Sequence, residues 1–280
     1  MEQKTEKKLR ECGMMTCIGF QGVGKTYQNM QVISDYVKDK IKTGVKGRKC
    51  LIVDSNGEYG QEQFTKNGVP NFNPKRIALS DVEAWCKTDI SECRRIDAKN
   101  VGIKEKKAIL EYLVRYARNL LLTIEDINSY ILSMTHMEEI VGGLVNLRHR
   151  GVDVFISYLR LRAVEPLIYS NSRWIRLHFS SGRMEDVMSK INNFELYKIA
   201  QLIVNNKYSS GDKRFFLYIS NIDNSIKGKF TKADFSHACK QYLSIYKKPL
   251  KEYEQMNDCS KEEAIDGKTK QYIEDYYGNN

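Results

Sequence analysis

The sequence contains no continuous apolar stretch long enough to cross a lipid bilayer. A membrane-spanning helix needs about 18 or more consecutive apolar residues, and no such run occurs in the 280 residues. Residues 1–10 are charged and lack the apolar core of a secretory signal peptide. We therefore expect a protein of the cytoplasm that has no stable membrane insertion.

Residue patterns typical of disulfide frameworks and metal cages are also missing. The seven cysteines are scattered along the chain, and no two of them have C-x-x-C spacing. Their odd number and irregular positions favour free thiols in a reducing compartment. The four histidines form no metal-binding pattern. With 41% hydrophobic and 29% charged residues, the composition is that of a soluble globular protein.

One glycine-rich segment, from Gly19 to Thr26, fits the phosphate-loop pattern G-x-x-x-x-G-K-[ST]. A short apolar run at residues 14–18 precedes it, and residues 27–43 follow it with apolar residues at helical spacing. In this strand–loop–helix context, glycines let successive backbone N–H groups point at phosphates. A glycine-rich turn with a chance lysine is the alternative, and the context argues against it.

The motif gives specific roles to its side chains. Lys25 is expected to reach the β- and γ-phosphates of ATP, and the Thr26 hydroxyl is expected to ligate Mg²⁺. The predicted nucleotide-binding residues are Gly19, Gln21, Gly22, Val23, Gly24, Lys25, Thr26 and Tyr27.

A second candidate motif ends the apolar run at residues 119–126, which is typical of a buried parallel strand. The run finishes in two carboxylates, Glu125 and Asp126. Ligands of α/β sheets bind at the carboxyl ends of the strands. There, one carboxylate can hold Mg²⁺ through water while the other orients the attacking water. An acidic cap on the following turn is the structural alternative.

Predicted strands alternate with predicted helices along the rest of the chain. Further strands are expected at residues 49–54, 77–79, 152–159, 174–179 and 214–220, and the strand at 174–179 alternates as if half exposed. Helices are expected at residues 103–118, 135–148, 184–204 and 231–246. This alternation predicts an α/β fold of the P-loop NTPase class (RecA-like, additional-strand), with a mostly parallel sheet and helices on both faces.

The expected domain organisation has three parts. Residues 1–13 form a basic N-terminal arm, residues 14–246 form the P-loop ATPase domain, and residues 247–280 form a polar C-terminal tail. The tail is rich in charged side chains, which is typical of a mobile segment.

Several motifs together resemble the FtsK–HerA superfamily of ring-forming, DNA-pumping ATPases. They are the phosphate loop, L-I-V-D-S-N-G-E-Y at 51–59, the acidic-ended run at 120–126, R-H-R-G-V-D-V-F-I-S-Y-L-R at 148–160, and the segment 166–179. The resemblance covers residues 14–204. It implies Mg²⁺-dependent ATP hydrolysis, a homo-oligomeric ring such as a hexamer, and double-stranded DNA held non-specifically through its phosphates.

The chain departs from the family pattern at identifiable positions. The family's acidic pair is usually aspartate then glutamate, whereas Glu125 precedes Asp126 here. By position, Glu125 takes the Mg²⁺ role and Asp126 the water-activating role, although Glu125 could serve both. Tyr158 stands where the family has a glutamine that senses the γ-phosphate, and its phenol can also donate a hydrogen bond. Without a winged-helix domain or membrane span, the chain resembles the viral genome-packaging branch more than cellular translocases or the Zot-like phage assembly ATPases.

Arginines after the acidic pair are candidates for a site completed by a neighbouring subunit. In ring ATPases such an arginine stabilises charge that develops on the γ-phosphate. Arg148 and Arg150 lie at a predicted helix end before the strand at 152–159, and Arg160 follows that strand. A surface charge or a DNA-phosphate contact is the alternative for each of them.

The net charge of +10 permits a nucleic-acid partner, although it also suits an ordinary basic protein. We expect an ATP-hydrolysing DNA translocase, the genome-packaging motor of a virus or phage. It would act in the host cytoplasm or on the virion, with a capsid or portal-vertex protein as partner. Two alternatives stay open: a small-molecule kinase with Arg94 and Arg95 in a lid, and an assembly protein that holds a nucleotide without acting as a motor.

Overall fold

The computed structural model describes residues 12–40, 44–59, 72, 74–130 and 134–278. Residues 1–11 of the expected N-terminal arm lie outside the described residues. So does the end of the helix expected at residues 27–43. The helix that is described there begins two residues earlier and ends at Val37.

The described strands form one nine-stranded sheet in the order β3-β4-β2-β5-β6-β1-β7-β8-β9. The strands are β1 (Met14–Ile18), β2 (Lys49–Asp54), β3 (Lys75–Arg76), β4 (Cys93–Asp97), β5 (Leu120–Ile124), β6 (Asp153–Tyr158), β7 (Ser172–His178), β8 (Phe216–Ser220) and β9 (Ser225–Gly228). From β3 to β7 all neighbours are parallel, and β8 and β9 continue the sheet antiparallel.

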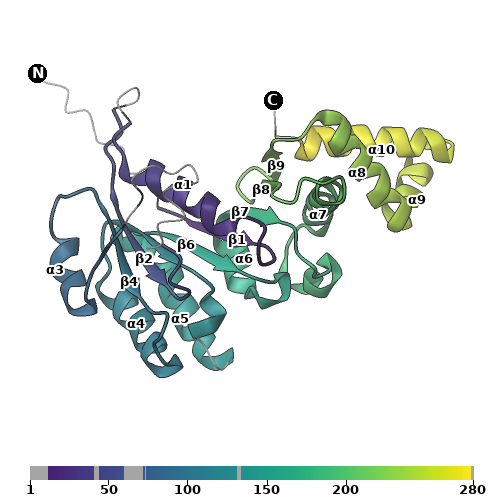
Figure 1. The fold of residues 1–280 in the computed structure, drawn as a ribbon. Coiled ribbons are helices and arrows are strands. Elements are labelled where there is room, and N and C mark those ends of the chain that lie inside the picture. Colours follow the sequence, from purple (N-terminus) through teal and green to yellow (C-terminus); the bar gives the residue numbers. More distant parts are fainter. Residues whose placement is uncertain (1–11, 41–43, 60–71, 73, 131–133, 279–280) are drawn as a thin grey trace, which may run out of the picture.

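Helices cover both faces of this sheet. They are α1 (Lys25–Val37), α3 (Val82–Cys86), α4 (Ile103–Tyr116), α5 (Met134–Asn146), α6 (Pro166–Asn171), α7 (Phe194–Ser209), α8 (Lys232–Ile245), α9 (Lys247–Asn257) and α10 (Lys261–Tyr276). Helix α1 lies on one face, and α4 and α5 lie on the other (Figure 1). The predicted α/β class, with a mostly parallel sheet, is therefore confirmed.

Alternation along the strands divides the core into two clusters. On the α1 face, Met30 and Ile33 pack with Leu121 of β5 and Phe155 of β6. On the opposite face, β5 contributes Leu120, Leu122 and Ile124 to the larger cluster. Because successive side chains of a strand point to opposite faces, a residue that continues β5 at position 125 points toward α1. This parity positions the site described below.

Four strands differ from the sequence prediction. The edge strand expected at residues 77–79 lies instead at Lys75–Arg76, as β3. Strands β4 and β9 were not predicted, because neither has an apolar alternation strong enough to mark a strand. Strand β7 was expected to be half exposed, but it lies between β1 and β8. Its polar residues Arg176 and His178 are fully buried. Polar residues at every second position indicate a solvent face only when nothing covers them.

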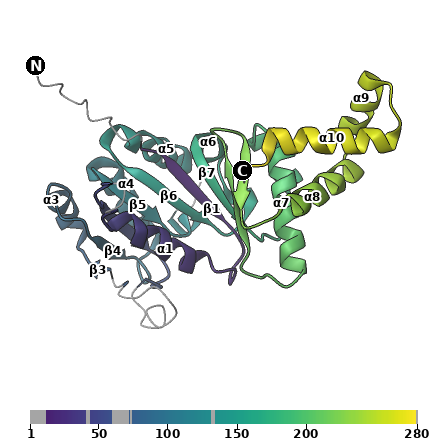
Figure 2. The same ribbon diagram turned by 90° about the horizontal axis from the view of Figure 1, so that it is seen from above.

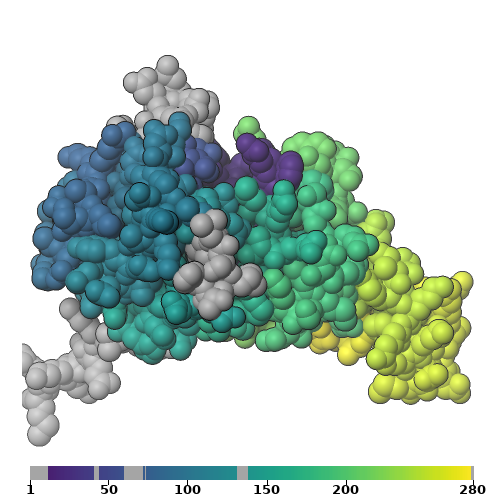
Figure 3. All heavy atoms as spheres, turned by 90° about the horizontal axis from the view of Figure 1, so that it is seen from below, coloured from purple at the N-terminus to yellow at the C-terminus, as the bar shows by residue number. Residues whose placement is uncertain are grey.

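The C-terminal residues are not the polar tail that the sequence predicts. They form α9 and α10, which pack with α8, and Leu250, Ala264 and Tyr272 are buried there. Helices α8–α10 lie at the end of the molecule remote from α3 (Figure 2). They form a lobe that projects from one end of the surface (Figure 3). Few apolar residues anchor α9 and α10, so their pattern is weak in the sequence.

Replacing Tyr272 tests whether these helices are part of the folded unit. The ring is 1% exposed and meets Tyr242 edge-on at a centroid distance of 5.8 Å. We expect Tyr272→Ala to lower the free energy of unfolding by about 3 kcal/mol, the usual cost of truncating a buried aromatic side chain. The exposed Lys270→Ala on the same helix is the control. Equal urea midpoints for the two variants would instead support the mobile polar tail that the sequence predicts.

Candidate active site

The loop between β1 and α1 has the backbone of a phosphate-binding turn. Gly22 and Gly24 have φ values of 81° and 84°, a left-handed conformation that glycine adopts without strain. A Cβ on Gly19 would lie 2.6 Å from the Cβ of His178, so a larger residue does not fit there. No side chain caps the start of α1. Its first N–H groups are therefore available to an anion.

A cavity of about 960 Å³ lies over this helix start, at the carboxyl edge of the sheet. Its walls come from the loop, α1 and the ends of several strands. The lining residues are Gln21, Gly22, Gly24, Lys25, Thr26, Tyr27, Asn56, Glu58, Glu125, Asp126, Ser157, Tyr158, Leu159 and Arg214. The structure thus brings the predicted loop and the predicted acidic pair together.

Lys25 and Thr26 already have partners within the site. The Lys25 ammonium donates to the carbonyl oxygens of Gly19 and Phe20, both at 2.7 Å. Burial lowers the pKa of Lys25, while nearby negative groups, Glu125 and Glu58 among them, oppose the shift. The Thr26 hydroxyl donates to Glu58 Oε2 at 2.5 Å. A phosphate or cation that binds Lys25 or Thr26 must therefore replace the hydrogen-bond partners that these side chains already have.

Glu125 points toward α1, as the parity of β5 requires, and is only 6% exposed. Its Oε1 accepts hydrogen bonds from the Asn29 amide, at 2.5 Å, and from the Tyr59 hydroxyl. Asn29 also donates to Ser157 Oγ at 3.1 Å. Burial raises the pKa of Glu125, and the hydrogen bonds from Tyr59 and Asn29 act against that rise. The two donors thus favour the ionised carboxylate that a cation needs.

A fully buried arginine on β7 holds the other side of Asn29. One Nη of Arg176 donates to Asn29 Oδ1, and the same nitrogen lies 3.2 Å from Cys17 Sγ. The guanidinium carbon lies 5.3 Å from the ring centroid of Phe155 and 5.7 Å from that of Phe216. Aromatic faces attract a desolvated cation. The sequence predicts a half-exposed strand at residues 174–179, among whose arginines Arg176 is a candidate for a neighbouring subunit's site, but Arg176 is buried within its own chain. Asn29 has no predicted role.

The turn after β2 directs two side chains into the site. Asp54 is fully buried, and its carboxylate accepts from the backbone N–H groups of Glu58, at 3.1 Å, and Tyr59, at 3.2 Å. Arg95 of β4 pairs with the same carboxylate at 3.3 Å. Asp54 therefore fixes the turn that aims Glu58 at Thr26 and Tyr59 at Glu125.

This arrangement also answers the kinase alternative. Arg94 and Arg95 lie within β4, where Arg94 pairs with Glu92 at 2.6 Å and Arg95 pairs with Asp54. They belong to a strand of the sheet and not to a lid.

Asp126 has a different environment from Glu125. Its backbone leaves the strand at φ 45°, and its side chain lines the cavity. Burial raises its pKa, whereas Lys25 and Lys106 act in the opposite direction. Ser129 N–H donates to the backbone carbonyl of Asp126, at 2.8 Å, and among the described residues no N–H group donates to its carboxylate. The carboxylate therefore does not act as an acidic cap on this turn.

At the end of β6, the polar side chain on the α1 face is Ser157. The Tyr158 ring belongs to the core cluster on the opposite face and is fully buried. Its hydroxyl has no hydrogen-bond partner among the described residues, and burial raises its pKa. Strand alternation places Ser157 on the face of Asn29 and Glu125, whereas the resemblance of the motifs points to Tyr158, the next residue along the strand.

The three candidate arginines lie at different edges of the sheet. Arg150 precedes β6 at the amino edge and donates to the carbonyls of Val114 and Arg115. Arg148 lines a small pocket near Gly13 at the same edge. Arg160 follows β6 and is exposed at the carboxyl edge. None of these three lines the cavity of its own chain.

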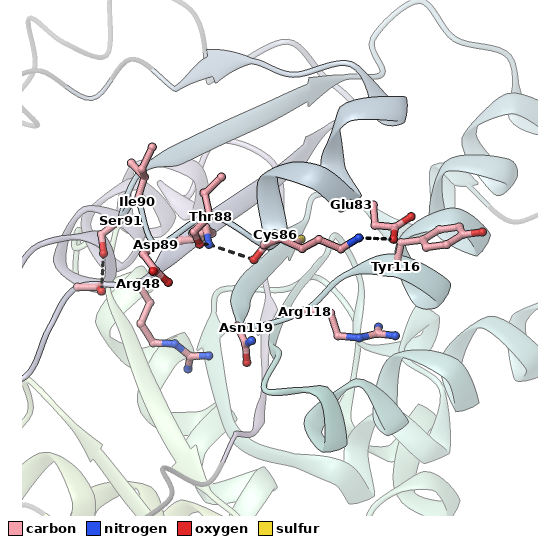
Figure 4. Close-up of a pocket in the computed structure, with 13 residues that line it drawn as sticks. Arg48, Glu83, Cys86, Thr88, Asp89, Ile90, Ser91, Tyr116, Arg118 and Asn119 are labelled. Atoms are coloured by element: carbon pink, nitrogen blue, oxygen red, sulfur yellow. Dashed lines mark hydrogen bonds and ion pairs between the residues drawn. The ribbon is translucent and has the colours of Figure 1, made fainter. Parts of the chain in front are cut away.

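A second cavity, of about 680 Å³, lies at the amino edge between α3 and the end of α4 (Figure 4). Its basic side chains are already engaged. Lys49 donates to the carbonyls of Cys86 and Thr88, and Arg118 donates to the carbonyl of Ala117 at 2.9 Å. Among the described residues that line this cavity, none belongs to a glycine-rich helix start. It therefore lacks the features that suit the carboxyl-edge cavity to phosphate.

The donor set at the carboxyl edge fits Mg²⁺. No cluster of three or more histidine, cysteine or acidic side chains in the described part of the chain is arranged to hold a metal alone. Mg²⁺ is usually bound by one or two protein oxygens together with water and substrate phosphates. The Thr26 hydroxyl and the Glu125 carboxylate supply oxygens of this kind. The site therefore suits a cation that arrives with a phosphate ligand.

The described helices include none with the length and apolar character needed to span a bilayer. No protein-family model matches the sequence, and the comparison with curated proteins finds no match.

Solved structures do resemble this one. The genome packaging NTPase B204 of Sulfolobus turreted icosahedral virus 2, in complex with ATP-gammaS, aligns over 78% of this chain and 97% of its own, with 14% identity and a TM-score of 0.50. The DNA-packaging ATPase B204 of Sulfolobus turreted icosahedral virus aligns over the same shares, with 17% identity and a TM-score of 0.50.

The N-terminal domain of zonular occludens toxin from Neisseria meningitidis aligns more loosely. It covers 61% of this chain and 79% of its own, with 13% identity, and its TM-score of 0.34 is too low to argue from. The first two likenesses concern the fold. The chain has the P-loop NTPase fold in the form found in a viral genome-packaging NTPase, as the resemblance of its motifs predicts.

Proposed function

We propose that this protein hydrolyses ATP with Mg²⁺ and uses the reaction to move double-stranded DNA, as the genome-packaging motor of a virus or phage. The observation that carries the proposal is the convergence of Lys25, Thr26, Glu125 and Asp126 on one cavity over an uncapped helix start. The fold that the chain shares with a genome-packaging NTPase supports it.

The side chains of the cavity suit phosphoryl transfer to water. The N–H groups at the start of α1 would bind phosphate oxygens, and Lys25 would leave its two carbonyl partners to reach the β- and γ-phosphates. Mg²⁺, when bound, would neutralise charge on those phosphates, held by Thr26 and, through water, by Glu125. Asp126 faces the cavity without a donor of its own among the described residues and would orient the attacking water.

A ring of identical subunits would complete this site. No arginine from the chain's own candidate set, Arg148, Arg150 or Arg160, lines the cavity. An exposed arginine of a neighbouring subunit could enter from solvent, and of the three exposed candidates Arg160 is the one at the carboxyl edge, where the cavity lies. The proposed assembly is therefore a homo-oligomeric ring such as a hexamer, in which one subunit stabilises charge in the next.

The proposed partner is duplex DNA, bound through its phosphates. A net charge of +10 would favour such contacts, which carry no sequence information. The proposed location is the host cytoplasm or the virion, with a capsid or portal-vertex protein as the docking partner.

Replacing Lys25 tests the site directly. We expect Lys25→Ala to lower ATP turnover by about a hundredfold or more, because it removes the cation that would meet the β- and γ-phosphates. Lys38→Ala, an exposed lysine after the far end of α1, is the matched control. Both variants would be measured by phosphate release at saturating ATP. Unchanged turnover in Lys25→Ala would remove this cavity from the mechanism.

The two strand-end carboxylates are expected to fail in different ways. Glu125→Gln should weaken Mg-ATP binding as well as turnover, because it removes charge from the cation. Asp126→Asn should keep binding and stop turnover, because the attacking water loses its acceptor. Titration calorimetry with Mg-ATP and steady-state rates would separate the two effects, with Glu83→Gln, whose side chain is 44% exposed and lies outside this cavity, as control. Normal turnover in both site variants would contradict the assignment.

DNA dependence separates a motor from a nucleotide-holding assembly protein. We expect duplexes of unrelated sequence to stimulate turnover equally. The stimulation should fall steeply with salt, because each neutralised phosphate contributes about −0.9 to the log–log slope of affinity. Basal hydrolysis should change less, because the site is partly buried and less screened. A flat salt response, or no stimulation by any DNA, would favour the assembly protein.

A further inference from the structure

The walls of the carboxyl-edge cavity are chemically unequal. On the side of β2, β5 and β6 lie Glu58, Glu125, Asp126 and Ser157. On the opposite side of the glycine loop, toward β7 and β8, the lining residue among those described is Arg214. The acidic wall suits a cation and an attacking water, while the other wall offers one guanidinium. The two ends of a long anionic ligand would therefore lie in different environments, one beside carboxylates and one beside a guanidinium.

Arg214 lies over the start of α1. It comes two residues before β8, whose first residue pairs with His178 at the carboxyl end of β7. The Cβ, Cγ and Cδ atoms of Arg214 lie 3.7–4.0 Å from where a Cβ on Gly24 would be. Its side chain is exposed, and within the described residues its guanidinium takes part in no ion pair. A donor group thus hangs beside the phosphate-binding turn.

The segment that carries Arg214 is anchored to the glycine loop. Phe20 N–H donates to the carbonyl of Phe179 at 2.8 Å. The Phe179 ring stacks on Tyr208, at the end of α7, with centroids 3.7 Å apart and planes at 10°. The Lys213 ammonium lies 3.9 Å from the centroid of the Tyr208 ring and donates to the Tyr208 backbone carbonyl at 2.9 Å. Arg214 follows directly, so these contacts hold its backbone beside the glycine loop.

We propose that Arg214 binds the nucleoside end of the nucleotide, its α-phosphate included, within the same chain. The inference rests on the proposed function. Lys25 and the acidic wall fix the γ-phosphate on the side of β5 and β6, so the rest of the molecule must extend across Gly24 toward the turn before β8. A guanidinium suits this place, because it donates two parallel hydrogen bonds to a phosphate and stacks on planar rings.

Comparing ATP with ADP tests this placement, because the two nucleotides share the nucleoside end and differ at the γ-phosphate. We expect Arg214→Ala to raise the Kd of ADP and of a non-hydrolysable ATP analogue by the same factor, about tenfold, as for one charge-assisted hydrogen bond. The KM for ATP should rise by a similar factor. Arg214→Lys, which keeps the charge but loses the planar fork, should fall between.

Arg183→Ala is the matched control, since Arg183 is 78% exposed in its side chain and lies outside the cavity. Titration calorimetry in the presence of Mg²⁺ gives the Kd of ADP and the Kd of the ATP analogue for each variant. Unchanged Kd values in Arg214→Ala, beside normal binding by the unaltered protein, would overturn this inference alone. Loss confined to the ATP analogue would place Arg214 at the γ-phosphate and also overturn it. An unaltered protein that binds neither nucleotide would overturn the proposed function and the inference together.

Discussion

The buried charge of Arg176 is the constraint on which the rest of the site depends. Moving a guanidinium out of water costs several kcal/mol unless partners compensate, and this one is fully buried. Asn29 connects this cation to the Glu125 carboxylate, because its side-chain oxygen accepts from Arg176 while its side-chain nitrogen donates to Glu125. These hydrogen bonds link strand β7, helix α1 and the end of strand β5. The phosphate-binding turn sits at the start of that helix, so its position follows from the same contacts.

Much of the fold could be predicted from the sequence, because short apolar strands such as β1, β2 and β5 are bounded by clear turns. The segments that could not be predicted owe their structure to neighbours. Strand β4 is held by its place between β3 and β2 and by the pair between Arg95 and Asp54. Helix α10 is held by a few buried residues, Tyr272 among them. Local pattern contains little of that information.

The site divides in the same way. The loop motif and the acidic pair are each a short continuous segment that can be recognised in the sequence, and the structure brings both to one cavity. Asn29, Tyr59 and Arg176 come from three separate elements and meet only in the folded chain. Asn29 could have been noticed, because it lies one helical turn after Lys25 on the face that buries Met30 and Ile33. The burial of Arg176 could not be predicted, since nothing local distinguishes a buried arginine from an exposed one.

The stacked rings of Phe179 and Tyr208 have a mechanical meaning. They join the glycine loop to the end of α7, and α7 packs against α8, which in turn contacts α10. Close-packed interiors transmit strain and do not absorb it. A displacement of Phe20 would therefore be passed through Phe179 and α7 to α8 and α10, and the contacts link the nucleotide loop to the C-terminal lobe.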